Sequence, residues 1–268
     1  MHERERSQFI LTLLRERAVV TVRDLQALTG ASAATVRRDL QALTEAGLVR
    51  RVHGGVESVD KITPKALAGS DFEVARRLNA ERKRAIAAAA VAMAEDGESI
   101  IINAGSTTYA MAEALIGRRL HILTNSFPMA QTLLATTENR IVLPGGEVYR
   151  KQGIVISPFD DDAIQHYTAS KMFMSCYAIG PMGVIEADPL IARAEAKLLR
   201  RADRLIVLAD SSKFEARGAL AVAPLSRVST VVTDDGAPKA SIAMLRNAGI
   251  EVQVVPVKAG AAREHSAA

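Results

Sequence analysis

Hydrophobic residues follow two different patterns along the chain. Near the N-terminus they recur at helical spacing, as in the stripe formed by Phe9, Ile10, Leu13 and Leu14. Farther on they form short, continuous, β-branched runs that are separated by helical stretches. This change of pattern predicts two domains with different architectures.

Three helices and a hairpin are expected in the N-terminal part. A helix over 6–17 precedes a shorter one that Thr21 caps and Gly30 ends, and Ser32 caps a third helix that runs to Gly47. The following stretch, LVRRVHGGV, combines β-branched residues with a Gly-Gly pair, which suits two short strands around a tight turn. Three helices followed by a small hairpin are typical of a winged helix-turn-helix.

Arginines occupy the side of the third helix that faces away from its apolar stripe. Val36, Leu40 and Leu43 share the side expected to be buried, and Asp39 lies near its edge. Small and hydrogen-bonding side chains on the outer side can approach and read base edges in a major groove. We therefore expect DNA contacts from this helix and the hairpin at Ser32, Thr35, Arg37, Arg38, Gln41, Arg50, Arg51 and His53. A solvated basic face is the alternative for an isolated helix, but the helices before it and the basic hairpin after it favour DNA.

The two patterns place domain boundaries at defined points. The DNA-binding domain is expected over 1–57, a linker over 58–79, an α/β domain over 80–258 and a flexible tail over 259–268. Within the linker region, the stretch 58–70 contains a proline and a glycine, and 71–95 is expected to be mainly helical. A basic run in this segment is interpreted as a solvated helix face; it comprises Arg76, Arg77, Arg82, Lys83 and Arg84.

Seven strands alternate with helices in the second domain. The strands are expected at 99–103, 121–124, 140–143, 172–179, 204–210, 229–234 and 250–255. The helices are expected at 107–116, 128–135, 189–202 and 238–248. Apolar strands that alternate with helices predict an α/β fold whose mainly parallel sheet is covered on both faces. Ligands of such sheets bind at the carboxyl ends of the strands.

Polar loops follow four of these strands. They are INAGSTTYA, LTNS, LPGGEVYRKQG and LADSSKF, and each can provide hydroxyls, amides or cations for a polar anion. A capped helix start or a structural ion pair would explain any one of them. Four such loops at one sheet edge favour a ligand, with contacts at Gly105, Ser106, Thr107, Thr108, Thr124, Asn125, Gly145, Gly146, Lys151, Asp210, Ser211 and Lys213.

Composition narrows the classes of protein without identifying a partner. The net charge of +4 and the pI near 9.3 permit nucleic-acid binding. A single cysteine, Cys176, excludes an internal disulfide. The longest apolar stretch, over 85–94, is far below the roughly 20 residues that a membrane span needs. The charged N-terminus shows no signal peptide, and we expect a cytoplasmic protein without membrane contact.

Both parts resemble one family. The stretch TVRDLQALTGASAATVRRDLQALTEAGLVRRVHGG resembles the N-terminal signature of DeoR-type bacterial transcriptional regulators, with its T-V-R-R-D-L helix and R-V-H-G-G wing. The G-S-T-T, T-N-S, P-G-G and VLADSSKF pieces, together with Glu195 in ARAEAKLL, resemble the sensor domain of the same family. The INAGST, SPF and AEAKLL pieces are similar to the L-ascorbate-utilisation branch.

The resemblance implies a sensor related to ribose-5-phosphate isomerase and a phosphorylated sugar or related metabolite as effector. It adds Glu195 and Asn103 to the expected effector-binding residues. Many relatives carry Asp where this chain has Asn103, so the preferred hydroxyl or phosphate could differ.

Two functions from different classes remain open. One is a regulator, expected to be a repressor of a carbohydrate-utilisation operon that binds double-stranded operator DNA as a homodimer or homotetramer. The other is a sugar-phosphate isomerase with a helical leader. An isomerase needs a positioned carboxylate base, yet YAIGPMGV, where related isomerases have an acidic motif, contains no acid. Neither Glu195 nor Asp210 has an obvious acid partner in the sequence, and we expect no catalysis, cofactor or metal.

Overall fold

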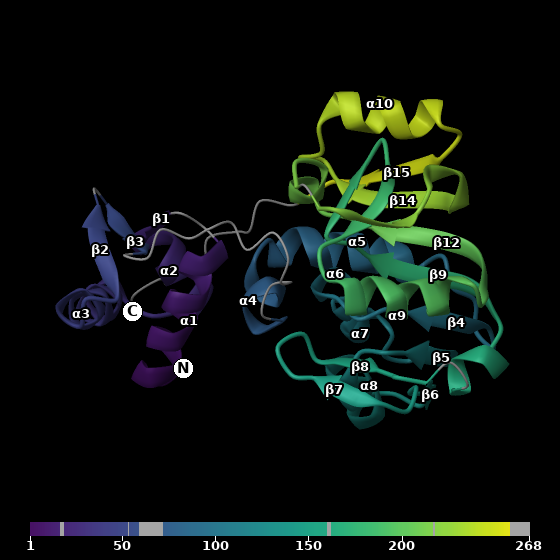
Figure 1. Ribbon diagram of the computed structural model, residues 1–268, viewed down its shortest axis with the longest axis horizontal. Coiled ribbons are helices and arrows are strands. Elements are labelled where there is room, and N and C mark those ends of the chain that lie inside the picture. The colour runs from purple at the N-terminus through teal and green to yellow at the C-terminus, as the bar shows by residue number, and fades with distance from the viewer. Residues whose placement is uncertain (17–18, 53, 59–71, 160–161, 217, 258–268) are drawn as a thin grey trace, which may run out of the picture. The chain divides into compact units, whose positions relative to one another are not determined.

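The chain forms two compact units, Met1–Leu78 and Asn79–Ala268. Figure 1 shows the computed structural model, which describes residues 1–16, 19–52, 54–58, 72–159, 162–216 and 218–257. The expected tail and His53 lie outside the described residues, as does most of the expected linker. The fold class predicted from the sequence is confirmed, with a helical first unit and an α/β second unit.

Three helices and a small sheet make up the first unit. The helices are α1 (Glu3–Glu16), α2 (Val22–Thr29) and α3 (Ala33–Glu45). Thr21 caps α2 in a capping box with Asp24, and Gly30 ends it in the left-handed conformation at φ 69°. Ser32 caps α3 through the backbone N–H of Thr35. The predicted caps are confirmed, and α3 ends two residues before Gly47.

A three-stranded antiparallel sheet completes the winged helix-turn-helix; one of its strands precedes α2 and the other two follow α3. Its strands are β1 (Val19–Thr21), β2 (Val49–Val52) and β3 (Gly55–Ser58), in the order β1-β3-β2. The predicted hairpin is β2–β3. The sequence did not indicate β1, which is only three residues long and has just one buried residue, Val20. Gly55 makes this pairing possible, because a Cβ built on it would lie 2.2 Å from the carbonyl oxygen of Val20.

A fourth helix extends the first unit beyond the expected boundary. Helix α4 (Phe72–Arg77) buries Val74 in the same core as α1, and the Arg77 guanidinium lies 5.2 Å from the centre of the Phe9 ring. The compact unit therefore ends at Leu78, whereas the sequence predicted a domain end at residue 57. The cause is the apolar side of α4, which a linker would leave in water.

A seven-stranded parallel sheet forms the centre of the second unit (Figure 1). Its order is β15-β14-β12-β9-β4-β5-β6, and each neighbouring pair is parallel. The strands are β4 (Ser99–Ile102), β5 (His121–Thr124), β6 (Arg140–Val142), β9 (Ala169–Ser175), β12 (Ala202–Leu208), β14 (Val228–Asp234) and β15 (Glu251–Val255). All seven were predicted from their apolar runs.

Helices cover both faces of this sheet. One face carries α5 (Ala80–Val91), α6 (Ser106–Tyr109), α7 (Met111–Ala114) and α8 (Phe127–Thr136), and the other carries α9 (Pro189–Leu199) and α10 (Lys239–Asn247). Alternate strand residues enter the two cores, so that Ile101 faces one core while Ile100 and Ile102 face the other. None of the helices among the described residues is long and apolar enough to cross a membrane.

Shorter elements lie outside the large sheet. They are β7 (Glu147–Tyr149) with β8 (Ile154–Ile156), the antiparallel set β10 (Ala178–Gly180), β11 (Gly183–Glu186) and β13 (Leu220–Ala223), and the 3-10 turns η1 (Ala163–His166), η2 (Ser211–Phe214) and η3 (Leu225–Arg227). The predicted strand 172–179 is therefore two strands, β9 and β10. The predicted helix 71–95 is also interrupted, at Asn79, whose backbone is left-handed at φ 54°.

Replacing Gly55 by Ala tests the close approach in the first sheet. A backbone oxygen cannot move aside as a flexible side chain can, so we expect a loss of about 1–3 kcal/mol of stability in the first unit. Thermal unfolding of the full chain, followed by circular dichroism, measures the loss. Gly180→Ala is the control, because its added Cβ would meet no atom within 4 Å. Equal melting curves for the two variants would contradict the proposed constraint.

Candidate functional site

A buried ion pair orients the third helix. Arg6 of α1 donates from Nε to Asp39 Oδ2 at 2.7 Å and from Nη2 to Asp39 Oδ1 at 3.1 Å. This contact fixes the side of α3 that faces the core, together with the buried Val36 and Leu40. Arg37 and Arg38 consequently point outward and are exposed, as the helical spacing predicted.

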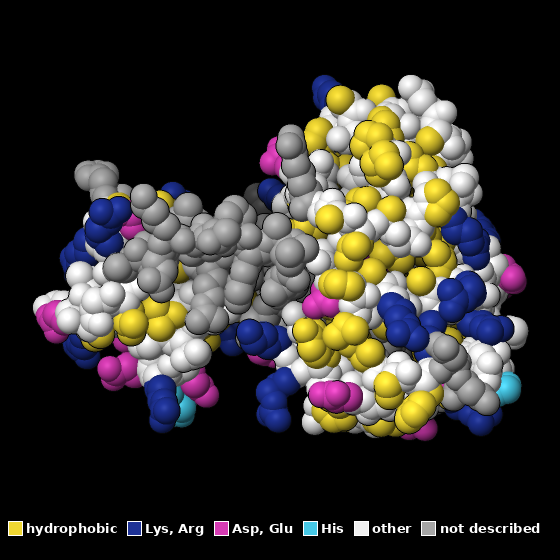
Figure 2. Space-filling model, in the orientation of Figure 1, with side chains coloured by type: hydrophobic (Ala, Val, Ile, Leu, Met, Phe, Trp, Pro, Cys, Tyr) yellow, Lys and Arg dark blue, Asp and Glu magenta, His cyan; other side chains and the backbone are white. Residues whose placement is uncertain are grey.

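Some of the remaining residues predicted to contact DNA already make hydrogen bonds or ion pairs within the protein. Gln41 is exposed and donates to Glu45 Oε1 at 3.0 Å. The Arg50 guanidinium is paired with Glu57 across the β2–β3 ladder at 2.6 Å, so its charge is partly neutralised. Arg51 is exposed. Figure 2 shows Lys and Arg side chains along the edge of this unit that carries α3 and β2.

Ser32 and Thr35 hold the start of α3. Ser32 Oγ accepts from the Thr35 backbone at 3.2 Å and lies 2.9 Å from Thr35 Oγ1. Ser32 is nevertheless exposed, so the hydroxyl pair borders the outer face with the two arginines. The outer face of α3 is therefore basic, rich in donors and free of large apolar side chains, which suits close approach to a polyanion.

At the carboxyl edge of the large sheet, Asn103 joins three elements. Its Nδ2 donates to the Ser175 carbonyl at 3.0 Å and to Glu195 Oε1 at 2.8 Å, and its Oδ1 accepts from the Ser175 backbone N–H at 2.9 Å. Asn103 is fully buried. Its side chain thus positions Glu195, and a contact between Asn103 and an effector stays a prediction. An Asp at this position could not donate to either partner.

Lys83 of α5 enters the same region from the opposite face of the sheet. Its Nζ donates to Ser106 Oγ at 2.9 Å, and only 4% of the residue is exposed. Burial lowers the pKa of this ammonium to about 8; Asp210 acts against the shift and Lys213 adds to it. A buried cation on a serine hydroxyl is a favourable partner for an oxyanion.

Asp210 is buried and accepts hydrogen bonds from described residues through only one of its two carboxylate oxygens. Its Oδ1 accepts from Asn79 Nδ2 at 3.1 Å, from the Ser212 backbone at 3.1 Å and from Ser212 Oγ at 2.5 Å. Its buried Oδ2 has no hydrogen-bond partner in the described part of the chain. Lys213, which follows in η2, places its ammonium 5.9 Å from the centre of the Tyr177 ring.

Arg82 is the neighbour of Lys83 and supports the loop after β12. Its Nη1 donates to Ser211 Oγ at 2.7 Å, and its Nε lies 3.6 Å from the buried Asp234 Oδ2. Asp234 Oδ1 in turn accepts from the Ser211 backbone at 2.6 Å. The interpretation of this basic run as a solvated face is wrong for Lys83 and Arg82, and it holds for the exposed Arg84.

Two carboxyl groups lie close together beside Asn103. Burial, and then the charge of Glu186, raise the pKa of Glu195 well above its ordinary value; burial also raises the pKa of Glu186. Glu195 Oε2 is buried and has no hydrogen-bond partner among the described residues. The expectation that Glu195 lacks an acid partner is therefore wrong. Glu186 stands nine positions earlier in the chain, and only the turn from β11 into α9 brings the two together.

Several residues predicted to contact the effector make hydrogen bonds inside the protein. Thr108 Oγ1 donates to the Asn103 carbonyl at 2.9 Å, and Thr124 Oγ1 accepts from the Ser126 backbone at 3.1 Å. Asn125 Oδ1 accepts from the Ala104 backbone at 2.7 Å. Thr107 is buried. These residues shape the loop after β4, where a Cβ on Gly105 would lie 1.7 Å from Ser175 Oγ.

The glycines and the lysine of the third polar loop belong to the β7–β8 region. Gly146 has φ 153°, and a Cβ on it would lie 2.3 Å from the Ile156 carbonyl oxygen. Gly145 and Lys151 are exposed.

The sequence patterns did not indicate Asn79, Arg82, Lys83 and Glu186 as residues of the site. Lys83 shares the helical side of Ile86, Ala87 and Ala90, so an apolar stripe with one charge in it was the available signal. Asn79 gave no signal, because its role depends on a left-handed backbone and on a partner 131 positions away.

The described residues give little support for a reactive thiol or a metal site. Burial raises the pKa of the Cys176 thiol to about 12, so it is protonated at neutral pH. Among the described side chains, no group of three or more His, Cys, Asp or Glu could hold a metal ion.

Known proteins resemble both units. The model of the DeoR-like helix-turn-helix domain matches residues 6–62, and that of the DeoR C terminal sensor domain matches residues 78–235. The HTH-type transcriptional regulator UlaR of Shigella dysenteriae is 29% identical over 252 residues, which cover 94% of this chain and 99% of that protein. UlaR of Escherichia coli O127:H6 is 29% identical over 255 residues, which cover 95% and 100%.

A solved structure of ribose 5 phosphate isomerase A from Neisseria gonorrhoeae is 18% identical, with a TM-score of 0.39 over 50% of this chain and 53% of that one. The name of the two relatives agrees with the branch that the sequence motifs indicate. Because the sensor model alone matches more than half of the residues, the chain belongs to the DeoR family of helix-turn-helix transcriptional regulators.

Proposed function

We propose that this chain represses a carbohydrate-utilisation operon and that its affinity for operator DNA changes when a phosphorylated sugar binds the second unit. The observation that carries the sensing part is the ammonium of Lys83, which is buried on Ser106. Burial makes this charge costly, and an anionic ligand would recover part of that cost. Thermal-shift measurements on the full chain with pentose and hexose phosphates test the proposal, with orthophosphate as the reference anion.

The effector would bind by two kinds of contact. Its phosphate would lie against Lys83 and Ser106, with Lys213 as a second cation nearby. Its hydroxyls would donate to Asp210 Oδ2 and Glu195 Oε2, which are buried oxygens without a hydrogen-bond partner among the described residues. A ligand that carries both groups on one small frame is a sugar phosphate.

Operator binding would rest on the outer face of α3. Arg37 and Arg38 would read base edges or phosphates, and Arg51 of β2 would reach the backbone or the adjacent groove. A homodimer or homotetramer would place two such helices on half-sites about one helical turn, or a multiple of it, apart. If effector and operator favour different conformations, each weakens the other by the same factor.

The Glu186–Glu195 pair supports the alternative function, an isomerase, because a carboxyl group with a raised pKa can act as a general base. The helix-turn-helix unit and the regulator relatives favour sensing without catalysis. We expect no turnover of pentose or hexose phosphates in an isomerase assay. Turnover that Glu195→Gln abolishes would establish the alternative.

Replacing Arg37 or Arg38 by Ala should weaken operator binding. A lost guanine contact costs about 1–3 kcal/mol at one base position, whereas a lost phosphate contact weakens all sequences and flattens the salt dependence. Fluorescence anisotropy with operator DNA at several salt concentrations separates the two. Arg84→Ala, which removes an exposed arginine of the second unit, is the matched control. Wild-type affinity in both variants would contradict the orientation assigned to α3.

Replacing Lys83 by Met should raise the melting temperature at pH 7 and abolish the response to sugar phosphates. The folded protein holds this proton less tightly than the unfolded chain, since the pKa falls from 10.5 to about 8. Wild-type stability should therefore gain from this group as pH rises from about 8 to 10.5, and the variant should lack that gain.

The matched control for this variant is Lys239→Met, at an exposed position of α10. It should change neither the melting temperature nor the response. A purely structural Lys83 predicts the opposite result, a lower melting temperature for Lys83→Met.

Asp210→Asn and Lys213→Ala test the rest of the site. Both should weaken the effector's influence on DNA binding, and operator affinity without effector should stay close to normal. Asn keeps the Oδ1 contacts of Asp210, so the melting temperature should change little. The melting temperature, operator affinity and effector response of the same proteins distinguish a role in effector binding from a structural role. Joint loss of stability and DNA binding would assign these residues to structural support instead.

A further inference from the structure

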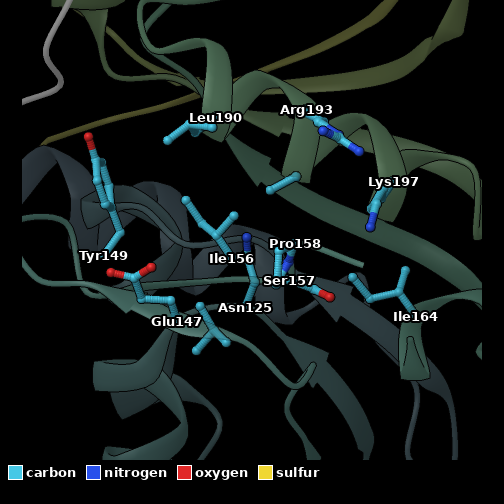
Figure 3. A pocket seen from close by; sticks show the side chains of 12 residues that line it. Asn125, Glu147, Tyr149, Ile156, Ser157, Pro158, Ile164, Leu190, Arg193 and Lys197 are labelled. Carbon is cyan, nitrogen blue, oxygen red and sulfur yellow. The ribbon is translucent and has the colours of Figure 1, made fainter. Parts of the chain in front are cut away.

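A cavity lies between α9 and the β7–β8 hairpin, and neither Lys83 nor Asp210 lines it. Its volume is about 300 Å³ (Figure 3). That is at the lower end of the roughly 300–1,000 Å³ typical of small-molecule sites. Of the residues assigned above to the effector, only Asn125 lines it.

The inner wall of the cavity offers a hydrogen-bond donor without an acceptor. Asn125 is 2% exposed and its Oδ1 is used by the Ala104 backbone. No described residue accepts from its Nδ2, and the side chain lines the cavity. This amide faces the cavity, so it can donate to an oxygen of a molecule bound there.

The rest of the lining is apolar in the middle and charged at its ends. Ile156 and Leu190 lie between the two ends in Figure 3. Arg193 and Lys197 extend from α9 at one end, while Glu147 and Tyr149 stand at the other. Lys197 already donates to the Phe159 carbonyl and to Asp162, and Tyr149 OH donates to Asp188.

We propose that this cavity binds a second small ligand, an amphipathic organic anion with an apolar ring or branched body. Its anionic oxygens would lie beside Arg193 and Lys197, its body would cover Ile156 and Leu190, and an acceptor oxygen would take the Asn125 Nδ2 proton. A bare sugar phosphate fits this lining poorly, since its hydroxyls would face apolar walls. Figure 2 shows hydrophobic and basic side chains next to each other over α9, where such a molecule would enter. This inference does not depend on the function proposed above.

The probe for the test is 8-anilinonaphthalene-1-sulfonate, which joins an aromatic body to one anionic group and fluoresces when it is shielded from water. We expect one saturable site per chain in the full-length protein. Arg193→Gln should weaken binding about tenfold by removing a charge-assisted contact. Leu190→Trp should abolish binding by filling the cavity from the exposed first turn of α9. Orthophosphate should not displace the probe.

Two matched variants serve as controls. Arg204→Gln removes an exposed arginine, and Leu134→Trp enlarges an exposed leucine; neither residue lines the cavity. Both should bind the probe as the unchanged protein does. Absence of binding, or equal binding by all four variants, would overturn the proposal. It would also be overturned if Leu190→Trp changed the sedimenting mass while the probe failed to bind, because the cavity would then belong to an interface between copies.

Discussion

The second unit depends on one buried amide. Asn103 holds β4 to β9 through both backbone groups of Ser175, and it holds α9 through Glu195. Each of these groups is out of reach of water, so each needs a partner inside the protein. An amide can supply a donor and an acceptor at once, and a carboxylate of the same shape cannot. The Asn at this position is therefore matched to its neighbours.

The position of this amide follows from the architecture of the sheet. Apolar side chains use both faces of the seven strands, so polar groups collect where the strands end. The pKa shifts of Lys83, Glu186, Glu195 and Cys176 share burial as their main cause. Such an edge holds charged groups away from solvent. It suits a ligand that brings its own charge and hydroxyls.

The sequence predicts the helices and strands better than it predicts the residues of the candidate effector site. Seven apolar runs were long enough to give every strand of the large sheet, and the caps at Thr21 and Ser32 marked two helix starts. Strand β1 has only one buried residue, and β10 was merged with β9 because one apolar run, 172–179, continues across the gap between them. Position at a strand end does not reveal which way a side chain points, which is why Asn103 and Thr124 were expected to contact a ligand. Lys83 was missed because its charged neighbours suggested a solvated face.

The division between the two units has a consequence for how a signal could travel. Val74 sits in the core of the first unit, and Asn79, five positions later, donates to Asp210 in the second. Helix α4 ends at Arg77 and α5 begins at Ala80. A ligand that alters the left-handed backbone of Asn79 therefore acts within a few rotatable bonds of the core that carries α3. Such coupling would need only the continuous backbone between α4 and α5, because a change in the backbone angles of Asn79 would change the direction of the chain between the two helices.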